Sequence, residues 1–343
     1  MSSLGEAAVR IGVLGFGRMG ALHAGNTVRT PGARLAAICD VDADARLRAS
    51  GSHAVPVFER IDEFLAADLD AVIISSSTQC HSEQVQLCAE AGVAVFTEKP
   101  VGLSMAEATA ALVAVERSGV AFQIGYQRRW DPAYAEMKSL VDDGAIGRPV
   151  FFRAFGRDPD ASSVSKWGLD KNGGIFLNCA IHDYDIARFL FGSEVATVSA
   201  SGAVAVHSGL QVVGDLDACS TTLKFAGGEM AVTEWTRFSP YGFSLHAELI
   251  GTDGVLELGS SRFEGLTLRR RAQTRTAVVD RFEHAFRASL EAFVESVREG
   301  RTPIPGRPDA LASLQIALAA RQSYENGSIV TDVGTFLSAG TGL

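Results

Sequence analysis

The sequence predicts two domains, an α/β domain with a doubly wound parallel sheet and an α+β domain with an open antiparallel sheet covered by helices. A chain of 343 residues exceeds one comfortable hydrophobic core. Up to Tyr126, apolar strand-like runs alternate with helical patterns, as in parallel sheets with crossover helices. From residue 149 onward, strand-like runs follow one another without helices between them. We therefore expect domains over residues 1–126 and 127–343.

The first domain is predicted to contain six strands joined by helices. The run Ala71–Ile74 is apolar throughout, which fits a strand that is covered on both faces. The loop Ser75–Cys80, which follows it, should face a bound ligand. The predicted strands lie at 9–14, 34–40, 69–75, 94–97 and 121–126, with a short one ending at Phe58; predicted helices follow Gly20 and Asp42 and lie at 61–67, 81–91 and 104–118.

The second domain is predicted as hairpins and a few helices. A helix is expected near 131–142, a strand at 149–157, and hairpins at 223–237 and 243–258 that turn about Ala226–Glu229 and Thr252–Gly254. Apolar positions with helical spacing predict helices at 282–299 and 308–326, the last one stopped by Gly327. We expect these two helices to cover one face of the sheet. The other face needs polar residues or a partner subunit, so a homo-oligomer is expected.

A glycine-rich turn follows the first predicted strand. The segment Gly15-Phe16-Gly17-Arg18-Met19-Gly20 stands between an apolar run and a helical pattern, and a second apolar run ends at Asp40. In this setting Gly15 permits a tight turn, Gly17 lets the backbone approach a pyrophosphate, and Gly20 lets the helix pack closely on the strand. The diphosphate then lies at the N-terminus of that helix. The pattern predicts a dinucleotide-binding Rossmann domain rather than an ordinary glycine turn.

Asp40 bears on the choice of cofactor. A carboxylate there accepts hydrogen bonds from the ribose hydroxyls of NAD but repels the 2′-phosphate of NADP, so we expect NAD and consider NADP the less favoured cofactor. The competing interpretation makes Asp40 or Asp42 an N-cap for the helix beginning near Ala43. Asp42 fits the cap better, which leaves Asp40 for the ribose. Arg46 and Arg48 are too far along that helix to be assigned to a phosphate.

The composition is that of an ordinary globular protein. A net charge of −9 opposes nucleic-acid binding, and the basic run Arg269–Arg271 reads as a solvated strand face. Five cysteines without a C-x-x-C pair argue against a zinc site and a disulfide framework, so we expect no metal and a reducing cytoplasm. The sequence shows no export-signal pattern and no run near 18 apolar residues, so we expect no membrane partner.

Two segments carry side chains suited to proton transfer. The first, Thr97-Glu98-Lys99-Pro100, stands at the carboxyl end of a predicted parallel strand, where open α/β sheets bind ligands. Lys99 is therefore aimed at the site, where it can orient a hydroxyl or, if burial lowers its pKa, act as a base. The competing interpretation is a plain loop, the commoner setting of a Lys-Pro pair.

The second segment reads as a helix entered through Gly173 and Gly174. Asn178, His182 and Asp185 are spaced four and three residues apart, so they share one face of a regular helix. On a surface helix they would form a solvated face with an N-capping asparagine, which is the competing interpretation. Lys99 in the first segment favours the interpretation that these three residues are catalytic rather than a solvated face.

Five segments resemble the family of glucose-fructose oxidoreductase, inositol 2-dehydrogenase and the rhizopine-catabolism proteins, especially its inositol dehydrogenase branch. Together they span nearly the whole chain. They are Ile11–Gly20, Thr97–Pro100, Ile124-Gly-Tyr-Gln-Arg-Arg-Trp-Asp131, Gly173–Asp185 and Tyr241-Gly242-Phe243. The resemblance implies the two-domain fold described above and a homotetramer or a dimer.

The resemblance also implies hydride exchange between a nicotinamide and a secondary alcohol of a cyclic polyol or sugar, most of all an inositol or related cyclitol. Lys99 and His182 would act at the reacting carbon, His182 as proton acceptor and Lys99 by stabilising alkoxide character. Further family contacts carry over residue by residue, although His81 is equally explained as a helix start. Implied for the cofactor are Ser75, His81, Glu98 and Gln127, and for the substrate Arg128, Asp158, Asn178, Asp185 and Tyr241, in addition to those already named.

One position departs from the family pattern. Inositol dehydrogenases of the family have an aspartate four residues before the histidine, where this chain has Asn178. An amide can hold the imidazole by a hydrogen bond but cannot stabilise imidazolium by charge. Three outcomes follow: Lys99 carries the proton transfer, Asp183 or Asp185 supplies the charge, or the natural substrate and direction differ from inositol oxidation.

Two other functions compete with the dehydrogenase. Some family members use NAD transiently to cleave glycosidic bonds without net redox, and others are non-catalytic proteins that sense NAD or a sugar. The asparagine at position 178 favours a sensor, whereas retention of both Lys99 and His182 favours an enzyme, because a sensor needs no proton acceptor.

Overall fold

The computed structural model describes residues 8–159, 169–239, 242–259 and 281–335. The chain forms two compact units, Met1–Gln127 with His284–Leu311 and Arg128–Glu283 with Ala312–Leu343. The predicted fold class is confirmed, with a parallel Rossmann sheet in the first unit and a second sheet covered by helices in the other. Compared with the expected division, Gln127 and residues 284–311 group with the first unit.

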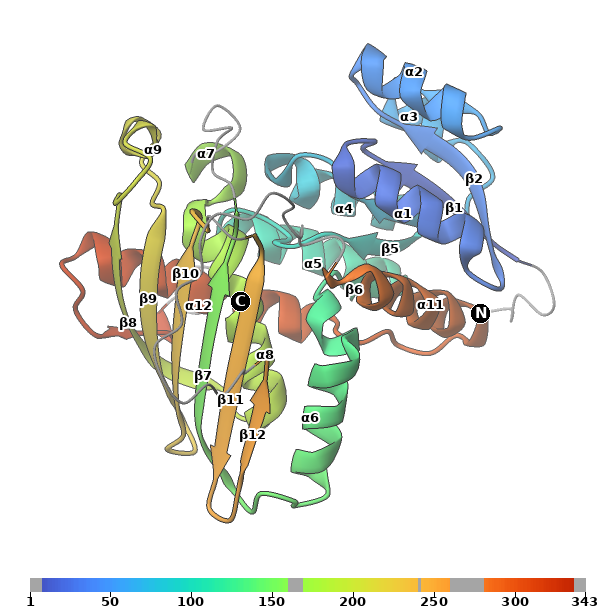
Figure 1. Cartoon of the computed structure of the whole chain (residues 1–343). Coiled ribbons are helices and arrows are strands. Elements are labelled where there is room, and N and C mark those ends of the chain that lie inside the picture. Colours follow the sequence, from blue (N-terminus) through green and yellow to red (C-terminus); the bar gives the residue numbers. More distant parts are fainter. Residues whose placement is uncertain (1–7, 160–168, 240–241, 260–280, 336–343) are drawn as a thin grey trace. The chain divides into compact units, whose positions relative to one another are not determined.

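The first unit is built on a six-stranded parallel sheet, drawn in blue and cyan in Figure 1, with the strand order β3-β2-β1-β4-β5-β6. Every strand from Val9 to Ile124 lies where it was predicted, within two or three residues. The strands are β1 (Val9–Leu14), β2 (Ala33–Cys39), β3 (Val57–Phe58), β4 (Ala71–Ile74), β5 (Ala94–Thr97) and β6 (Phe122–Ile124). The order reverses at β1, so a crevice forms where the chain turns from β1 toward β2 on one side and β4 on the other.

Helices connect these strands, and local sequence sets their ends. Asp42 caps its helix by accepting a hydrogen bond from the Ala45 amide at 2.7 Å, as predicted. Ser104 caps another helix through the Glu107 amide, and Gly119 ends it in the left-handed conformation with φ of 68°. The helices are α1 (Arg18–Arg29), α2 (Ala43–Ser52), α3 (Ile61–Leu65), η1 (Thr78–Cys80), α4 (His81–Glu90) and α5 (Met105–Ser118), and the short η2 (Gln127–Trp130) follows β6 where the second unit begins.

One helix from late in the sequence belongs to this unit. Helix α11 (Glu283–Glu299) lies beside α1 in Figure 1, and its Leu290, Phe293 and Val294 join the core formed by strands β1, β2, β4 and β5. The expectation that this helix covers the second sheet was wrong. An apolar stripe specifies that a face is buried, but it does not specify which partner buries it.

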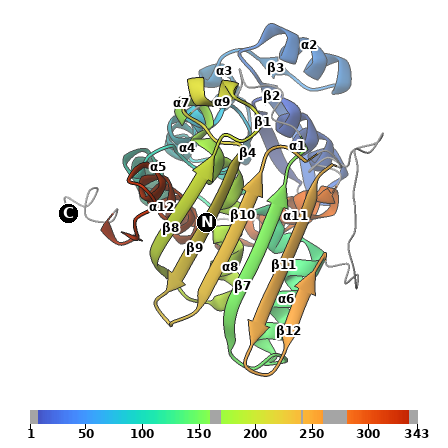
Figure 2. The ribbon, with the colours of Figure 1, turned by 60° about the vertical axis from the view of Figure 1, so that its left-hand side comes forward.

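The second unit contains a seven-stranded sheet of order β12-β11-β7-β10-β9-β8-β13 (Figure 2). Both predicted hairpins are present, β9 with β10 and β11 with β12. The sheet is mixed rather than purely antiparallel, because β7 and β10 pair in parallel. The strands are β7 (Pro149–Arg157), β8 (Val195–Ala203), β9 (Ala218–Phe225), β10 (Met230–Thr236), β11 (Ser244–Gly251), β12 (Val255–Leu258) and β13 (Thr331–Asp332).

Helices cover one face of this sheet. In Figure 2, α6 and α8 lie behind the strands, and the strand residues that alternate toward them are buried. The helical segments are α6 (Pro132–Asp142), α7 (Leu169–Asn172), the π-helical turn η4 (Phe176–Ala180), α8 (Ile181–Phe191), α9 (Gly209–Val212) and α12 (Arg307–Glu325). Within the described ranges, no helix combines the length and the apolar character needed to cross a membrane.

The position of α11 predicts the effect of truncating its central phenylalanine. Phe293 is fully buried, and its ring lies 5.7 Å from that of Phe96 in β5. Phe293→Ala should lower the free energy of unfolding by about 3–5 kcal/mol, measured by urea unfolding, because it leaves a cavity in the first unit's core. Leu47→Ala, at a position on α2 that is 74% exposed, is the control and should change it by less than about 0.5 kcal/mol. Equal losses in the two variants would contradict the assignment of α11 to this core.

Candidate active site

A cavity of about 830 Å³ opens at the carboxyl ends of β1, β2, β3 and β4, where doubly wound sheets bind ligands. The glycine segment, Asp40 and the loop after β4 form much of its lining. Of the predicted residues, the cavity is lined by Gly15, Gly17, Arg18, Met19, Asp40 and Ser75. The predicted orientation of the Ser75–Cys80 loop is confirmed, since Ser76, Ser77 and Cys80 line it too.

The three glycines have different steric surroundings. Gly15 has a φ of 89°, and a Cβ there would lie 2.6 Å from the backbone of Ser76. A Cβ on Gly20 would lie 1.8 Å from the Gly15 carbonyl oxygen, so only glycine lets α1 approach β1 this closely. A Cβ on Gly17 would meet no described atom within 4 Å. Gly17, at the start of α1, therefore borders open space where a pyrophosphate can approach the backbone.

Asp40 is held at the edge of the cavity by backbone amides. Its carboxylate accepts hydrogen bonds from the Phe16 amide at 2.5 Å and from the Asp42 amide at 2.8 Å. A carboxylate offers about four lone-pair sites, so both oxygens keep capacity for a ribose hydroxyl. Asp40 thus also ties the glycine turn to the end of β2, a role that the sequence did not reveal.

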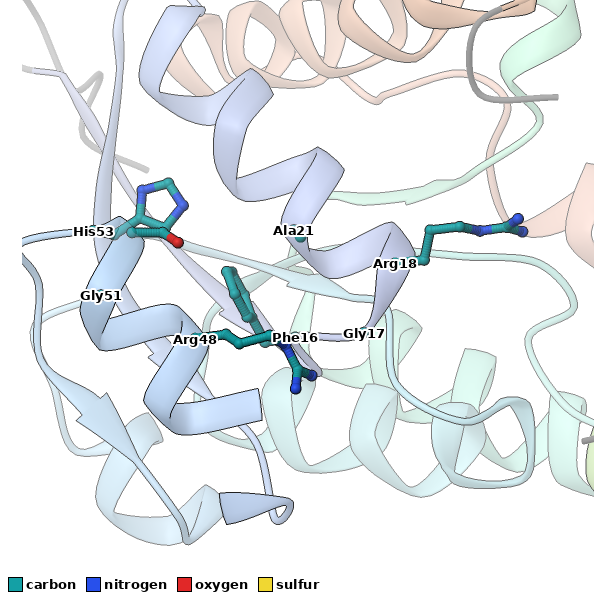
Figure 3. Close-up of a pocket in the computed structure, with 8 residues that line it drawn as sticks. Phe16, Gly17, Arg18, Ala21, Arg48, Gly51 and His53 are labelled. Carbon is teal, nitrogen blue, oxygen red and sulfur yellow. The ribbon is translucent and has the colours of Figure 1, made fainter. Parts of the chain in front are cut away.

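Phe16 has a structural role within the motif. Its ring is 4% exposed and meets the ring of His53 edge-on, with 5.9 Å between centroids. Figure 3 shows Phe16 projecting between α1 and α2, beside a second hollow of about 740 Å³, while Arg18 and Arg48 point in different directions. Phe16 therefore lines this second hollow and is not among the residues that line the main cavity, while its amide is bonded to Asp40.

Two further side chains at the cavity, Ser75 and Cys39, have no charge and no reactive role that their contacts support. The Ser75 hydroxyl donates to the Gly15 carbonyl at 3.0 Å and so stabilises the turn. Burial, followed by the charge of Asp40, raises the pKa of the Cys39 thiol to about 12. Cys39 is thus an uncharged thiol at neutral pH and not a nucleophile.

Three of the predicted cofactor residues are buried near the ends of β5 and β6. Glu98 Oε1 lies 2.8 Å from Nε2 of His23, and the His81 ring nitrogens lie 2.8 Å from the Pro100 carbonyl oxygen and 3.3 Å from that of Ser76. The Gln127 side chain is 4% exposed, and its Oε1 has no hydrogen-bond partner among the described residues. A buried acceptor without a partner is costly, so Gln127 suits a polar group of a ligand.

In the second unit, two glycines admit the segment that carries Asn178 and His182. Gly173 and Gly174 have φ of 77° and 75°, a conformation that other residues rarely adopt. The Ile175 amide then donates to Asp215 at 2.9 Å. Asn178 falls in the π-helical turn and His182 in the first turn of α8.

The prediction that Asn178, His182 and Asp185 share one face assumed a regular α-helix, and this assumption was wrong for Asn178. A π-turn has more residues per turn than an α-helix, so the four-residue spacing to His182 no longer fixes their relative direction. Such turns are frequent at functional sites. No local sequence pattern distinguishes this turn from ordinary helix.

Arginines neutralise the two carboxylates near His182. The buried Arg128 pairs with Asp183 at 2.5 Å, and the Trp235 indole also donates to Asp183. Arg129 forms a two-pronged pair with Asp185 at 2.6 and 2.9 Å. Arg128 is 2% exposed, and its guanidinium lies 5.4 Å from the Trp235 ring centroid. These pairs join α8 to the segment that carries Arg128 and Arg129, and each carboxylate has an arginine that offsets its negative charge.

The remaining predicted substrate residues lie at the end of β7 and beyond. Asp158 is half-buried, and its amide donates to the Thr236 carbonyl at 2.8 Å while its carbonyl accepts from Ser239. Tyr241 lies outside the described residues.

Several residues at the site were not found from the sequence. The cavity is also lined by Arg60 in the loop after β3, by Ile61 and Asp62 at the start of α3, and by Gln84 and Leu87 of α4. The position of the β3 loop at the carboxyl edge of the sheet was the available signal, because such loops face the ligand. The buried His23 gave no such signal, since it reads as part of the helical pattern of α1.

Comparisons with known proteins agree with this geometry. Residues 9–126 match the family model described as an oxidoreductase family with an NAD-binding Rossmann fold, and residues 134–257 match the GFO/IDH/MocA C-terminal domain. The glycine turn, the open space at Gly17 and the carboxylate of Asp40 fit NAD.

Relatives cover nearly the whole chain. The chain is 37% identical to scyllo-inositol 2-dehydrogenase (NAD(+)) of Bacillus subtilis, with 94% of this chain and 96% of the relative covered. It is 33% identical to inositol 2-dehydrogenase of Rhizobium meliloti, with 92% and 96% covered. The crystal structure of scyllo-inositol dehydrogenase from Lactobacillus casei with NAD(H) and scyllo-inositol has a TM-score of 0.87 at 30% identity, covering 95% of this chain and 99% of that one. The chain therefore belongs to the GFO/IDH/MocA family of oxidoreductases, with an NAD-binding Rossmann domain.

Proposed function

We propose that the protein is an NAD-dependent dehydrogenase that oxidises a secondary hydroxyl of a cyclic polyol, most of all an inositol or a related cyclitol. The observation that carries the proposal is the pairing of a dinucleotide cavity with Lys99, which stands where β5 ends at the same edge of the sheet. The inositol dehydrogenases among the relatives supply the substrate class. Bound NAD supplies the hydride acceptor.

The chemistry asks for one proton acceptor and one group that stabilises negative charge. As hydride leaves the carbon, the hydroxyl becomes a carbonyl and its proton must go to a base. We assign the proton to His182, whose ordinary pKa near 6.5 suits neutral pH, and alkoxide stabilisation to the Lys99 ammonium. Asn178 orients the imidazole by hydrogen bonding and, unlike an aspartate, adds no negative charge.

The balanced carboxylates in the second unit support this division of roles. Since Asp183 pairs with Arg128 and Asp185 with Arg129, each carboxylate has an arginine that offsets its negative charge. The positive charge of Lys99 then becomes the main electrostatic aid to the reaction, because it lowers the energy of the alkoxide directly. We assign substrate hydroxyls to Asp158 and Asn178, since a polyol needs several fixed polar partners.

The other predicted cofactor residues of the first unit support the cofactor site. Ser75, His81 and Glu98 support the turn and the Lys99 segment, and Gln127 offers its buried acceptor to the nicotinamide amide. Asp40 excludes a 2′-phosphate by charge.

The assembly and the location complete the proposal. The sheet face away from α8 carries the partly exposed Phe151, Phe155, Val232 and Ile250, beside charged residues. A second copy covering this face would bury them, so we propose a homo-oligomer, either a dimer or a tetramer. All five cysteines are free thiols, which suits a reducing cytoplasm.

The first test is the initial rate of NADH formation with myo-, scyllo- and chiro-inositol, glucose and xylose, each with NAD and with NADP. A cyclitol should be the best substrate, and NAD should be preferred because Asp40 repels the extra phosphate. Binding of NAD without turnover of any compound would contradict the proposed activity and favour a sensor. Product formation at constant nicotinamide absorbance would indicate the glycosidase instead.

Lys99→Ala should lower kcat for the best cyclitol by about 10² or more, because the ammonium group that stabilises the alkoxide is lost. NAD binding, followed by protein fluorescence, should persist. Lys138→Ala is the control, since that lysine pairs with Asp142 on the partly exposed α6. Full activity of Lys99→Ala would remove the lysine from the mechanism.

Phe155→Glu should shift the protein to a smaller species in light scattering after size-exclusion chromatography. The Phe155 ring stacks on His246 with 4.5 Å between centroids on the sheet face proposed as the interface, and a carboxylate there opposes burial. Leu47→Glu, on exposed α2, is the matched control and should leave the mass unchanged. An unchanged mass for Phe155→Glu would place the interface elsewhere.

A further inference from the structure

Two buried histidines contact the residues on either side of Lys99. The segment Glu98–Pro100 leaves β5 after a last ladder bond, in which the Glu98 amide donates to the Ile74 carbonyl at 2.9 Å. His23 of α1 then contacts the Glu98 side chain, and His81 of α4 contacts the Pro100 carbonyl, both at 2.8 Å. The two histidines are 0% and 2% exposed. Two different helices therefore fix the residues immediately before and after the lysine.

His23 acts through a single ring nitrogen. Its Nε2 faces Glu98, while its buried Nδ1 has no hydrogen-bond partner in the described part of the chain. Because a buried N–H without an acceptor is costlier than a bare lone pair, the hydrogen belongs on Nε2. The rings of Phe96 and Phe286 meet the imidazole edge-on, with centroids at 5.5 and 6.1 Å, and so restrict its rotation.

Glu98 is ionised and therefore a strong acceptor for this bond. Burial alone would raise the pKa of Glu98, but the hydrogen bond from His23 and the nearby charge of Lys99 hold it below its ordinary value. A hydrogen bond to a charged acceptor is stronger than one between neutral groups. The carboxylate is consequently held in one position next to the lysine.

His81 acts through the other nitrogen. Its Nδ1 and Nε2 face the carbonyl oxygens of Pro100 and Ser76, both of which can only accept. Burial lowers the pKa of His81 despite those two carbonyls, so the ring is neutral and donates once. The Nδ1 to Pro100 distance of 2.8 Å is shorter than the Nε2 to Ser76 distance of 3.3 Å, so we place the hydrogen on Nδ1, which donates to the Pro100 carbonyl.

We propose that His23 and His81 are positioning residues that jointly fix the backbone around Lys99 and so set where its ammonium group meets the substrate oxygen. This inference rests on the proposed role of Lys99 in the reaction. Neither ring turns toward a substrate, since both are buried and engage protein atoms. Their contribution is geometric, and displacement of a reacting group by about 1 Å can cost about 10² in rate.

The opposite nitrogens used by the two histidines give a reciprocal test. A glutamine amide reaches the position of Nε2 and an asparagine amide that of Nδ1, so each can replace one nitrogen only. His23→Gln and His81→Asn should therefore lose much less activity than His23→Asn and His81→Gln. The two mismatched variants should lower kcat for the best cyclitol by about 10–100-fold while NAD affinity changes far less.

Thermal unfolding of the histidine variants and the activity of Lys99→Ala distinguish a loss of positioning from a loss of stability and from a failure of the proposed function. All four variants are compared by thermal unfolding, and each histidine is an independent test, so a variant that does not fold leaves the other pair to decide. Equal losses for Gln and Asn at both positions, or losses that follow the unfolding temperature alone, would overturn the positioning role. Lys99→Ala is measured in parallel. If it is inactive while the histidine pattern is absent, only this inference fails; if it is fully active, the proposed role of Lys99 fails first.

Discussion

Parallel pairing of β1, β4 and β5 is the constraint on which the cavity and the Lys99 segment depend. Ile11–Leu14 pairs in register with Ala71–Ile74, which in turn pairs with Ala94–Thr97. The ladder continues past the strand ends, where the Ser75 amide donates to Leu14 and the Glu98 amide to Ile74, at 2.8 and 2.9 Å. Because these parallel strands end at the same edge of the sheet, the loops that follow them also begin there. These loops are the glycine turn, the serine loop and the lysine segment.

Beyond that edge, side-chain contacts rather than the sheet determine how precisely the segments around the site are positioned. Asp40 ties the glycine turn to β2, and the two histidines hold Glu98 and Pro100. In the second unit, Arg128 and Arg129 hold the carboxylates of α8. Buried pairs of this kind add little net stability, since desolvation offsets their attraction, but they allow few alternative arrangements. Lys99 and His182, the two side chains proposed to react, thus stand on elements that are fixed by buried polar contacts.

At position 178 this chain has an asparagine, where its resemblance to inositol dehydrogenases implies an aspartate. The structure adds two facts to that departure: the asparagine lies in a π-helical turn, and the carboxylates at 183 and 185 are paired with arginines. An asparagine, unlike an aspartate, adds no negative charge that would stabilise a proton on a neighbouring imidazole. In the proposed mechanism, the charge of Lys99, and hence its placement, becomes correspondingly more important.

The sequence by itself determined the strands of the first unit, the glycine turn, the cap at Asp42 and the hairpins of the second, because each depends on residues close together in the chain. It also determined that Lys99 lies at the edge of the sheet where ligands bind, because Lys99 comes directly after the end of a parallel strand. Only the tertiary structure decided that α11 packs against β1 and β5, that β7 pairs in parallel with β10, and that His23 meets Glu98. An apolar stripe or a lone histidine indicates burial without naming its partner, and residues 75 positions apart meet only once the whole unit has packed.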